Sequence, residues 1–372
     1  MQYDRSAVVR KLVASITLAA ATSGLAFAQA SHVNRGSDSD DAFLPSPVRM
    51  ASTVPSNGDV NPYGVAFIKN NFLTGSGPLQ YGDILVSNFN NKNNLQGTGT
   101  TIVRIPKSGS PALFFQGTSP LGLSTGLGTL QYGFVLVANL PTQDGTAATA
   151  GRGSLLVINN QGKLIQTFTS SQINGPWDAT VVDNGDRATV YISNALDGTV
   201  SRIDFAVNFN GLTKLDHYTI ASGFMHQPDP AALFDAPTGL VYDRNTDKLY
   251  VASTLDNAVF VVDNASKRTT SNGPGEIVYK DNAHLHGALA MAEAPNGHLL
   301  VTNNDVINAD PNQPSEIVEF TKHGEFVKEI PVDPNLGGSF GLGVNRVSDD
   351  TAILAAVDDN TASITIWTLP LE

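Results

Sequence analysis

The chain has 372 residues, of which 41% are hydrophobic, and a formal net charge of −12. A protein this acidic repels nucleic acids and anionic lipid surfaces, so we expect no nucleic-acid partner. It contains no cysteine, which excludes disulfides, a thiol nucleophile and a cysteine metal site.

The first thirty residues have the pattern of an export signal. Arg5, Arg10 and Lys11 precede an apolar run over residues 12–25, and small residues follow at 26–30. The run is shorter than the ~18 residues that a membrane-spanning helix needs. We therefore expect residues 1–30 to be cleaved and the product to be periplasmic or secreted, with no transmembrane segment left after cleavage. Residues 31–46 are polar and are predicted to be a flexible leader.

Six copies of one pattern follow in the rest of the chain. Each copy opens with a three-residue entry that ends in glycine or, once, aspartate, and short apolar strands such as "ATVYIS", "KLYVAS" and "HLLVT" come next. The third residues of the entries are 48 to 62 positions apart. The predicted entries are 62–64, 124–126, 176–178, 237–239, 285–287 and 339–341.

This period predicts one four-stranded sheet per repeat. Helical periodicity is essentially absent, and "DNGDR", "DRNTD" and "APNG" are tight-turn sequences between strands. We therefore predict an all-β fold, a six-bladed β-propeller of four-stranded antiparallel blades over residues 47–372. Its larger insertions, predicted as loops on the propeller faces, are 68–81, 89–99, 141–152, 206–234 and 304–314.

The last repeat, residues 340–369, has sequence for only three strands before the chain ends. A blade with three strands would expose an edge that can pair with other chains. Residues 47–54 are the one unassigned β-like stretch, and we expect this N-terminal strand to close the propeller as the outermost strand of the sixth blade.

The start of the first strand and the end of the second lie on one face of an antiparallel blade. That face would carry Asn88, Asn139, Asn194 and Asn303 beside the entry residues Tyr63, Thr125, Trp177, Thr238, His286 and Phe340. We predict a ligand-binding funnel formed by Tyr63, Trp177, Phe340, Asn88 and Asn303. The alternatives are packing between blades for the aromatic residues, turn capping for the asparagines and a structural role for His286.

Asp178 replaces the entry glycine once, and this places a charge close to the axis. A carboxylate there needs a compensating partner. The motif Gly-x-Ser-x-Gly occurs around Ser124 and Ser339, but both copies coincide with repeat entries that a strand follows. A nucleophile elbow requires a following helix, so repetition explains these matches better than a catalytic serine does.

The stretches "YISNALDGTVSRID" and "LYVASTLDNAVFVVD" resemble the repeats of NHL and YVTN β-propellers. The resemblance covers residues 60–369 and implies the fold rather than a function. The expected architecture is also similar to that of gluconolactonase-like six-bladed propellers, which hold an axial cation with Glu, Asp and Asn. The first-blade acid of that family would fall near Asn61 or Tyr63, and no Glu stands there.

Two functional hypotheses follow, and the sequence leaves open whether the protein is an enzyme. The first is an exported, non-catalytic propeller that binds a small molecule, a carbohydrate or a protein through its funnel face. The alternative, implied by the second resemblance, is a cation-dependent hydrolase or lyase with calcium as the possible cofactor. In that enzyme Asp178, Asn139 and Asn194 would bind the metal, and His286 would be the catalytic acid–base group. A structural envelope component is a third class.

Overall fold

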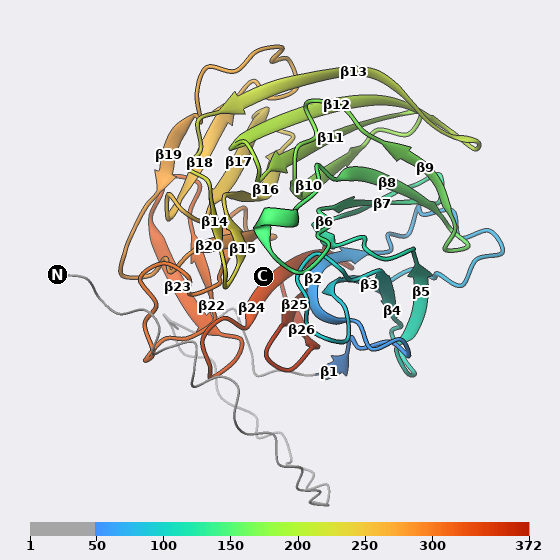
Figure 1. The fold of residues 1–372 in the computed structure, drawn as a ribbon, viewed down its shortest axis with the longest axis horizontal. Coiled ribbons are helices and arrows are strands. Elements are labelled where there is room, and N and C mark those ends of the chain that lie inside the picture. Colours follow the sequence, from blue (N-terminus) through green and yellow to red (C-terminus); the bar gives the residue numbers. More distant parts are fainter. Residues whose placement is uncertain (1–48, 372) are drawn as a thin grey trace, which may run out of the picture. The chain divides into compact units, whose positions relative to one another are not determined.

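The computed structural model describes residues 49–371, so the predicted signal peptide at 1–30 and leader at 31–46 lie outside the described residues. Six four-stranded antiparallel sheets form a ring, which confirms the predicted all-β, six-bladed propeller (Figure 1). The innermost strands contact one another around the axis in the order β2, β6, β10, β16, β20 and β24, and β24 returns to β2.

The first three blades follow the chain from the innermost strand outward. Blade one contains β2 (Val60–Phe67), β3 (Ile84–Asn90), β4 (Thr101–Ile105) and β5 (Ala112–Gln116). Blade two contains β6 (Leu123–Leu130), β7 (Phe134–Asn139), β8 (Ser154–Asn159) and β9 (Leu164–Phe168). Blade three contains β10 (Pro176–Asp183), β11 (Arg187–Asn194), β12 (Thr199–Asn208) and β13 (Gly211–Ser222).

The other three blades complete the ring. Blade four contains β16 (Pro237–Asp243), β17 (Lys248–Ser253), β18 (Ala258–Asp263) and β19 (Glu276–Tyr279). Blade five contains β20 (Ala288–Glu293), β21 (Leu299–Asn303), β22 (Glu316–Phe320) and β23 (Phe326–Pro331). Blade six contains β24 (Ser339–Arg346), β25 (Thr351–Asp358), β26 (Ser363–Pro370) and β1 (Arg49–Ser52).

The sequence forms these strands because each blade is packed on both faces by its neighbours. Every residue of β3 and β7 is buried, whereas the outer strand β9 is largely exposed. Side chains of blades one and two meet in a single apolar cluster that includes Leu85, Ile102 and Val135. Second and third strands therefore read as continuous apolar runs without the alternation of a half-buried strand.

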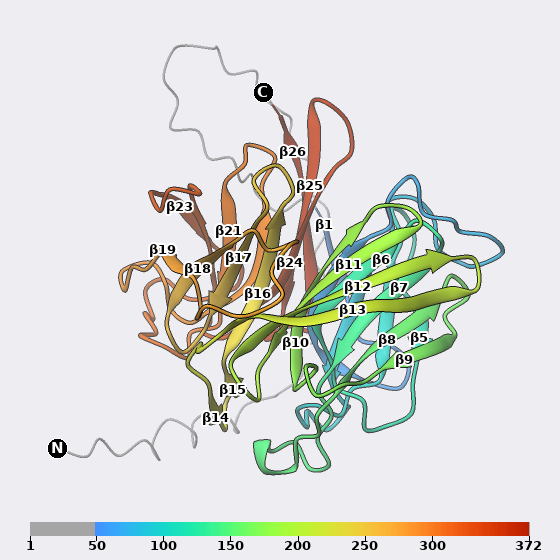
Figure 2. The ribbon, with the colours of Figure 1, turned by 90° about the horizontal axis from the view of Figure 1, so that it is seen from above.

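The closure prediction is confirmed. Strand β1 pairs antiparallel with β26, with Arg49 opposite Ile366 and Ser52 opposite Ser363, and it is the outermost strand of blade six. The Arg49 guanidinium also donates to the carbonyl oxygen of Pro106 at 2.8 Å. Strand β1 thus covers the free edge of β26 and ties it to blade one (Figure 2).

One predicted loop is wrong. Residues 206–222, part of the expected loop 206–234, continue β12 and form the twelve-residue strand β13. A turn at Phe209–Asn210 reverses the chain, and Gly211 there has a φ of 134°, which suits glycine. The rest of the segment contains a small hairpin of β14 (Gln227–Asp229) and β15 (Leu233–Asp235).

The described residues contain one short 3₁₀ helix, η2 (Ala147–Thr149). Among residues 49–371, no helix has the length and hydrophobicity to cross a membrane.

Candidate functional site

The recurrent asparagines lie opposite residues at the start of the innermost strands, at or close to the repeat entries. Asn88 pairs with Pro62, Asn139 with Leu123, Asn194 with Pro176 and Asn303 with Ala288. Each side-chain amide donates to a backbone carbonyl oxygen in the segment before an innermost strand. The acceptors are Thr53 at 3.0 Å, Leu121 at 2.8 Å, Gln172 at 3.1 Å and His284 at 2.7 Å. The asparagines therefore fasten the chain where it enters each blade, which explains why they recur.

The predicted aromatic residues form a packed cluster at the entry end of the axis. We call Tyr63, Phe89, Trp177 and Phe340 the aromatic plug. The Tyr63 ring centroid lies 4.7 Å from that of Phe89, 4.8 Å from Phe340 and 5.8 Å from Trp177. The exposed fractions of Tyr63, Trp177 and Phe340 are 2%, 1% and 9%. Packing between blades, the alternative to a ligand-binding role, accounts for these contacts. A ligand-facing role for Tyr63, Trp177 and Phe340 stays a prediction.

The entry glycines are needed because adjacent innermost strands come very close together there. A Cβ atom on Gly341 would lie 1.6 Å from the Tyr63 carbonyl oxygen, and one on Gly64 would lie 2.9 Å from the Thr125 carbonyl oxygen. Each first strand carries a β-bulge at this point. Asp178 occupies the same position in blade three.

The predicted fifth entry is three residues too early. The Ser87 hydroxyl accepts a hydrogen bond from the Gly64 amide, and Ser193 does so from Asp178. In blade five the equivalent bond runs from the Ala290 amide to Thr302 at 2.9 Å. The entry is therefore 288–290, and alanine takes the place of glycine. His286 lies in the segment before β20 and is not an axial entry residue.

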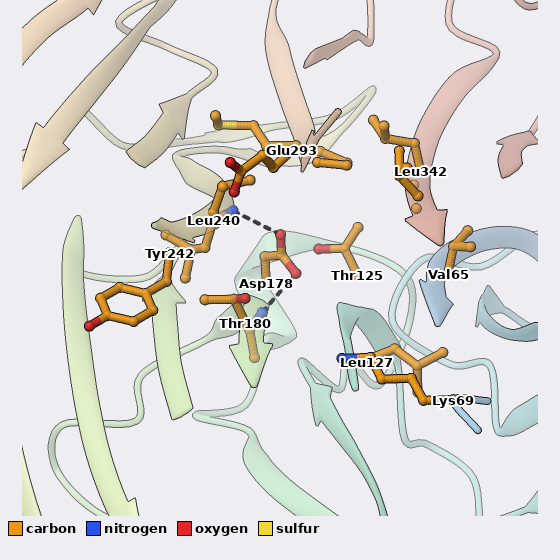
Figure 3. A pocket seen from close by; sticks show the side chains of 18 residues that line it. Val65, Lys69, Thr125, Leu127, Asp178, Thr180, Leu240, Tyr242, Glu293 and Leu342 are labelled. Atoms are coloured by element: carbon orange, nitrogen blue, oxygen red, sulfur yellow. Dashed lines mark hydrogen bonds between the residues drawn. The ribbon is translucent and has the colours of Figure 1, made fainter. Parts of the chain in front are cut away.

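Directly beyond the plug lies a cavity of about 360 Å³ on the propeller axis, which we call the axial cavity. The innermost strands of all six blades contribute to its wall. Many lining residues are aliphatic, but polar atoms form most of the surface that the wall presents to the cavity. Lys69, Tyr242 and Glu293 stand near the ends of their strands, away from the plug. Six of the lining residues are Val65, Thr125, Leu127, Asp178, Leu240 and Leu342 (Figure 3).

Asp178 is the buried acid of the axial cavity. Its exposed fraction is 9%, and its carboxylate accepts hydrogen bonds from the backbone amides of Ala179 at 2.7 Å and Leu240 at 3.2 Å (Figure 3). Burial raises the pKa of Asp178 to about 6, and these two amides and the nearby Thr125 hydroxyl act in the opposite direction. No ion pair between residues of the described range 49–371 includes it.

Glu293 differs from Asp178 because a cation already neutralises it. Lys322 lies 2.7 Å from the Glu293 carboxylate and 2.9 Å from that of Asp243. Glu293 is also exposed, so water solvates its charge. Asp178 is therefore the acid of the cavity whose charge is least compensated.

The structure does not bring the predicted metalloenzyme residues together. Asp178 lines the axial cavity, whereas Asn139 and Asn194 bond to the chain before β6 and β10. His286 is buried beside the loop 304–314, where its Nδ1 atom lies 2.7 Å from the Asn308 carbonyl oxygen. Within residues 49–371, no three His, Asp or Glu side chains are grouped so that they could hold a metal ion. The metal and acid–base roles stay predictions.

The two Gly-x-Ser-x-Gly serines occupy strands, as expected from the repeat. Ser124 lies in β6, and its hydroxyl donates to the Pro176 carbonyl oxygen at 2.9 Å. Ser339 begins β24. Neither serine precedes a helix.

Sequence reasoning missed most of the cavity wall. Leu240, Leu342 and Lys69 lie one to five residues after the glycine of their entries. The pattern that located the entries could have identified them, because the residues after the bulge are the next to face the axis.

No protein family model and no curated protein matches the chain. Solved structures do. One is a catalytically inactive virginiamycin B lyase from Staphylococcus aureus, solved with quinupristin. It is 13% identical with a TM-score of 0.50, and the match covers 87% of this chain and 89% of the lyase chain. A luciferin-regenerating enzyme is 10% identical with a TM-score of 0.51, covering 87% and 95%. Regucalcin, a calcium-binding protein from Agrobacterium tumefaciens, is 12% identical with a TM-score of 0.49, covering 86% and 94%. At these identities the likeness shows the six-bladed propeller fold alone.

Proposed function

We propose that this protein is an exported propeller that binds a small amphipathic ligand in its axial cavity, with Asp178 receiving a cationic head group. The observation that carries the proposal is a buried carboxylate that lines the cavity and is compensated by two backbone amides and no basic side chain. Burying such a charge is costly, and a ligand cation would offset the cost.

The shape and lining of the cavity support a small ligand. A volume of about 360 Å³ falls at the lower end of the roughly 300–1,000 Å³ typical of ligand pockets. Val65, Leu127, Leu240 and Leu342 offer aliphatic contacts to an apolar body. The aromatic plug blocks the entry end, so the ligand would enter from the side of Lys69 and Glu293. This entrance replaces the funnel of Tyr63, Trp177 and Phe340 as our preferred binding face.

A comparison of three six-carbon probes tests the proposal by titration calorimetry at pH 7.5. Hexylammonium, hexanol and hexanoate have the same apolar body and differ in charge. We expect wild-type protein to bind hexylammonium about tenfold more tightly than hexanol, because a hydrogen bond to a charged group contributes about 1.5–3 kcal/mol. Hexanoate should bind most weakly.

Asp178→Asn keeps the shape of the side chain and removes its charge, so it should abolish the preference for hexylammonium. Asp186→Asn is the matched control, because Asp186 is an exposed aspartate in the turn between β10 and β11 of the same blade. The proposal fails if Asp178→Asn keeps the preference or if wild type shows none.

The cation-dependent hydrolase or lyase remains the alternative, and calcium is its natural probe. Thermal unfolding of wild type and Asp178→Asn in calcium and in chelator separates the two hypotheses. A calcium-dependent rise in melting temperature that Asp178→Asn removes would favour the alternative, because a ligand bound only by the native state stabilises it.

A further inference from the structure

A second cavity lies in blade five, far along the chain from Asp178. It has a volume of about 480 Å³ and is formed by β22, β23 and the segment that precedes β22. Its wall combines two carboxylates, two side-chain amides and proline rings, contributed by Glu316, Glu329, Asn312, Gln313, Pro311, Pro314 and Pro331. We call this cavity the blade-five pocket.

Buried acceptor atoms without partners gather at this pocket. Glu316 is 1% exposed and lines the pocket, and its Oε1 atom has no hydrogen-bond partner within the described residues. Its Oε2 atom accepts from the Asn303 amide at 3.2 Å. Oε2 of Glu329, which also lines the pocket, is buried and without a partner in the same range.

Two more buried polar atoms lie near Glu316 but do not line the pocket. Asp305 Oδ1 and His286 Nε2 are both buried and unpartnered within residues 49–371. His286 Nδ1 faces the Asn308 carbonyl oxygen, which can only accept, so Nδ1 carries a proton. The Ser315 amide next to Glu316 donates to Asp305, and the His286 amide donates to Asn303, whose side chain donates to Glu316.

Few donors reach these acidic groups: the Ser315 and Gly337 backbone amides donate to Asp305 Oδ2, and the Gln313 side-chain amide donates to Glu329 Oε1. No salt bridge within the described part of the chain includes Glu316, Glu329 or Asp305. Burial raises the pKa of Glu316 to about 7, so near neutral pH its carboxyl group is partly protonated in the absence of another cation. A buried acceptor left unpaired costs free energy, and a ligand that donates several hydrogen bonds would recover it.

The site suits a cation with delocalised charge and several donors better than it suits a metal ion. No three His, Asp or Glu side chains of residues 49–371 are grouped as metal ligands. A guanidinium group is planar, carries five donors and can bridge separated carboxylates, and its stem can pack on proline rings. We propose that the blade-five pocket binds a guanidinium group. The group would be supplied either by a free amine that carries a guanidinium group or by an arginine side chain of a peptide.

Three probes test this inference on the full chain by titration calorimetry. Agmatine represents the free amine, N-acetyl-arginine amide represents a peptide side chain, and N-acetyl-citrulline amide is an uncharged analogue of the latter with nearly the same shape. We expect at least one guanidinium probe to bind, and citrulline amide to bind about tenfold or more weakly than arginine amide, because charge-assisted bidentate bonds are lost. Tighter binding of agmatine indicates a free amine, and tighter binding of arginine amide indicates a peptide.

Glu316→Gln should weaken the guanidinium probes about tenfold, and Glu329→Gln provides a second, less buried substitution with the same expected direction. Glu276→Gln on the exposed face of β19 is the matched control and should leave binding unchanged. Asp178→Asn should also leave it unchanged, which separates this pocket from the axial cavity. Thermal unfolding of each variant checks that it is folded.

Equal binding of citrulline and arginine amides would overturn the inference, as would wild-type affinity in both folded glutamine variants. Calcium or magnesium that binds alone and is lost in Glu316→Gln would also overturn it, because the site would then be a metal site. Absence of binding by both guanidinium probes is a further contradicting result.

Discussion

The two ends of the propeller axis are built from successive residues of the same strands, yet they differ in character. At one end Tyr63, Trp177 and Phe340 fill the axis with aromatic rings. In β2 the cavity begins at Val65, two residues after Tyr63. In β10 it begins at Asp178, the residue after Trp177. A packed core and a cavity can therefore be one residue step apart, because side-chain size at the bulge decides whether the axis is filled.

The largest expected effect comes from removing the strand that holds both ends in one ring. Deletion of residues 49–52 removes β1, exposes the edge of β26 and breaks the bond from Arg49 to blade one. We expect loss of the single cooperative unfolding transition, measured by scanning calorimetry. Deletion of residues 31–46, the predicted leader, is the control and should leave the transition unchanged. An unchanged transition in the first deletion would show that β1 is not needed for closure.

A substitution in the aromatic plug should cost less but should still affect the whole fold. Trp177→Ala removes a side chain that is 1% exposed and packed against Tyr63 and Phe89, so we expect a loss of ~3–5 kcal/mol in the free energy of unfolding. Lys69→Ala at the other end should change it by less than ~0.5 kcal/mol. Urea unfolding measures both. A loss below ~1 kcal/mol for Trp177→Ala would remove the contrast and restore the ligand-facing interpretation.

The smallest expected effect is a pH dependence at the cavity end. Burial raises the pKa of Asp178 from 3.8 to about 6, so ionisation is harder in the folded state than in the unfolded state. Its contribution to stability is therefore greatest below pH ~4 and is lost as the pH rises through about 6. The total change is on the order of 3 kcal/mol at ~1.4 kcal/mol per pKa unit.

The difference in unfolding free energy between wild type and Asp178→Asn, measured at pH 4, 5, 6 and 7, isolates this effect. Glu316 and other buried acids titrate in both proteins, so their contributions cancel in the difference. A difference that does not change with pH would show that Asp178 is hydrated and that its charge costs little.

The sequence predicted the fold well because blade formation depends on local signals. Short apolar runs and turn residues located the strands, and the missing strand of blade six pointed to residues 47–54. The fifth entry was misplaced because the pattern followed Gly287, whereas the strand register requires a small residue at Ala290. Strand β13 was missed because a run of exposed residues, which includes Lys214 and Asp216, hides the alternation expected of a strand.

The candidate sites were harder to predict because they depend on distances between blades. The sequence does not show that Trp177 packs in the plug while its neighbour Asp178 lines a cavity. Asp178 could be selected because a charge replaced a glycine. Glu316 could not, because it begins a strand and only the fold brings Glu329 and the residues of loop 304–314 around it.

Strand β1 also has a consequence for the order in which the protein folds. The Thr53 hydroxyl, directly after this strand, donates to the Ala362 carbonyl oxygen 309 residues away at 2.9 Å. Blades one to five use only neighbouring segments and can form as the chain emerges from the ribosome. Blade six can form only when both β1, the first strand of the fold, and β26, the last one, are available to pair. Because contacts between distant segments form slowly, closure of the ring is expected to limit the folding rate, and a chain that lacks β1 or β26 would remain open.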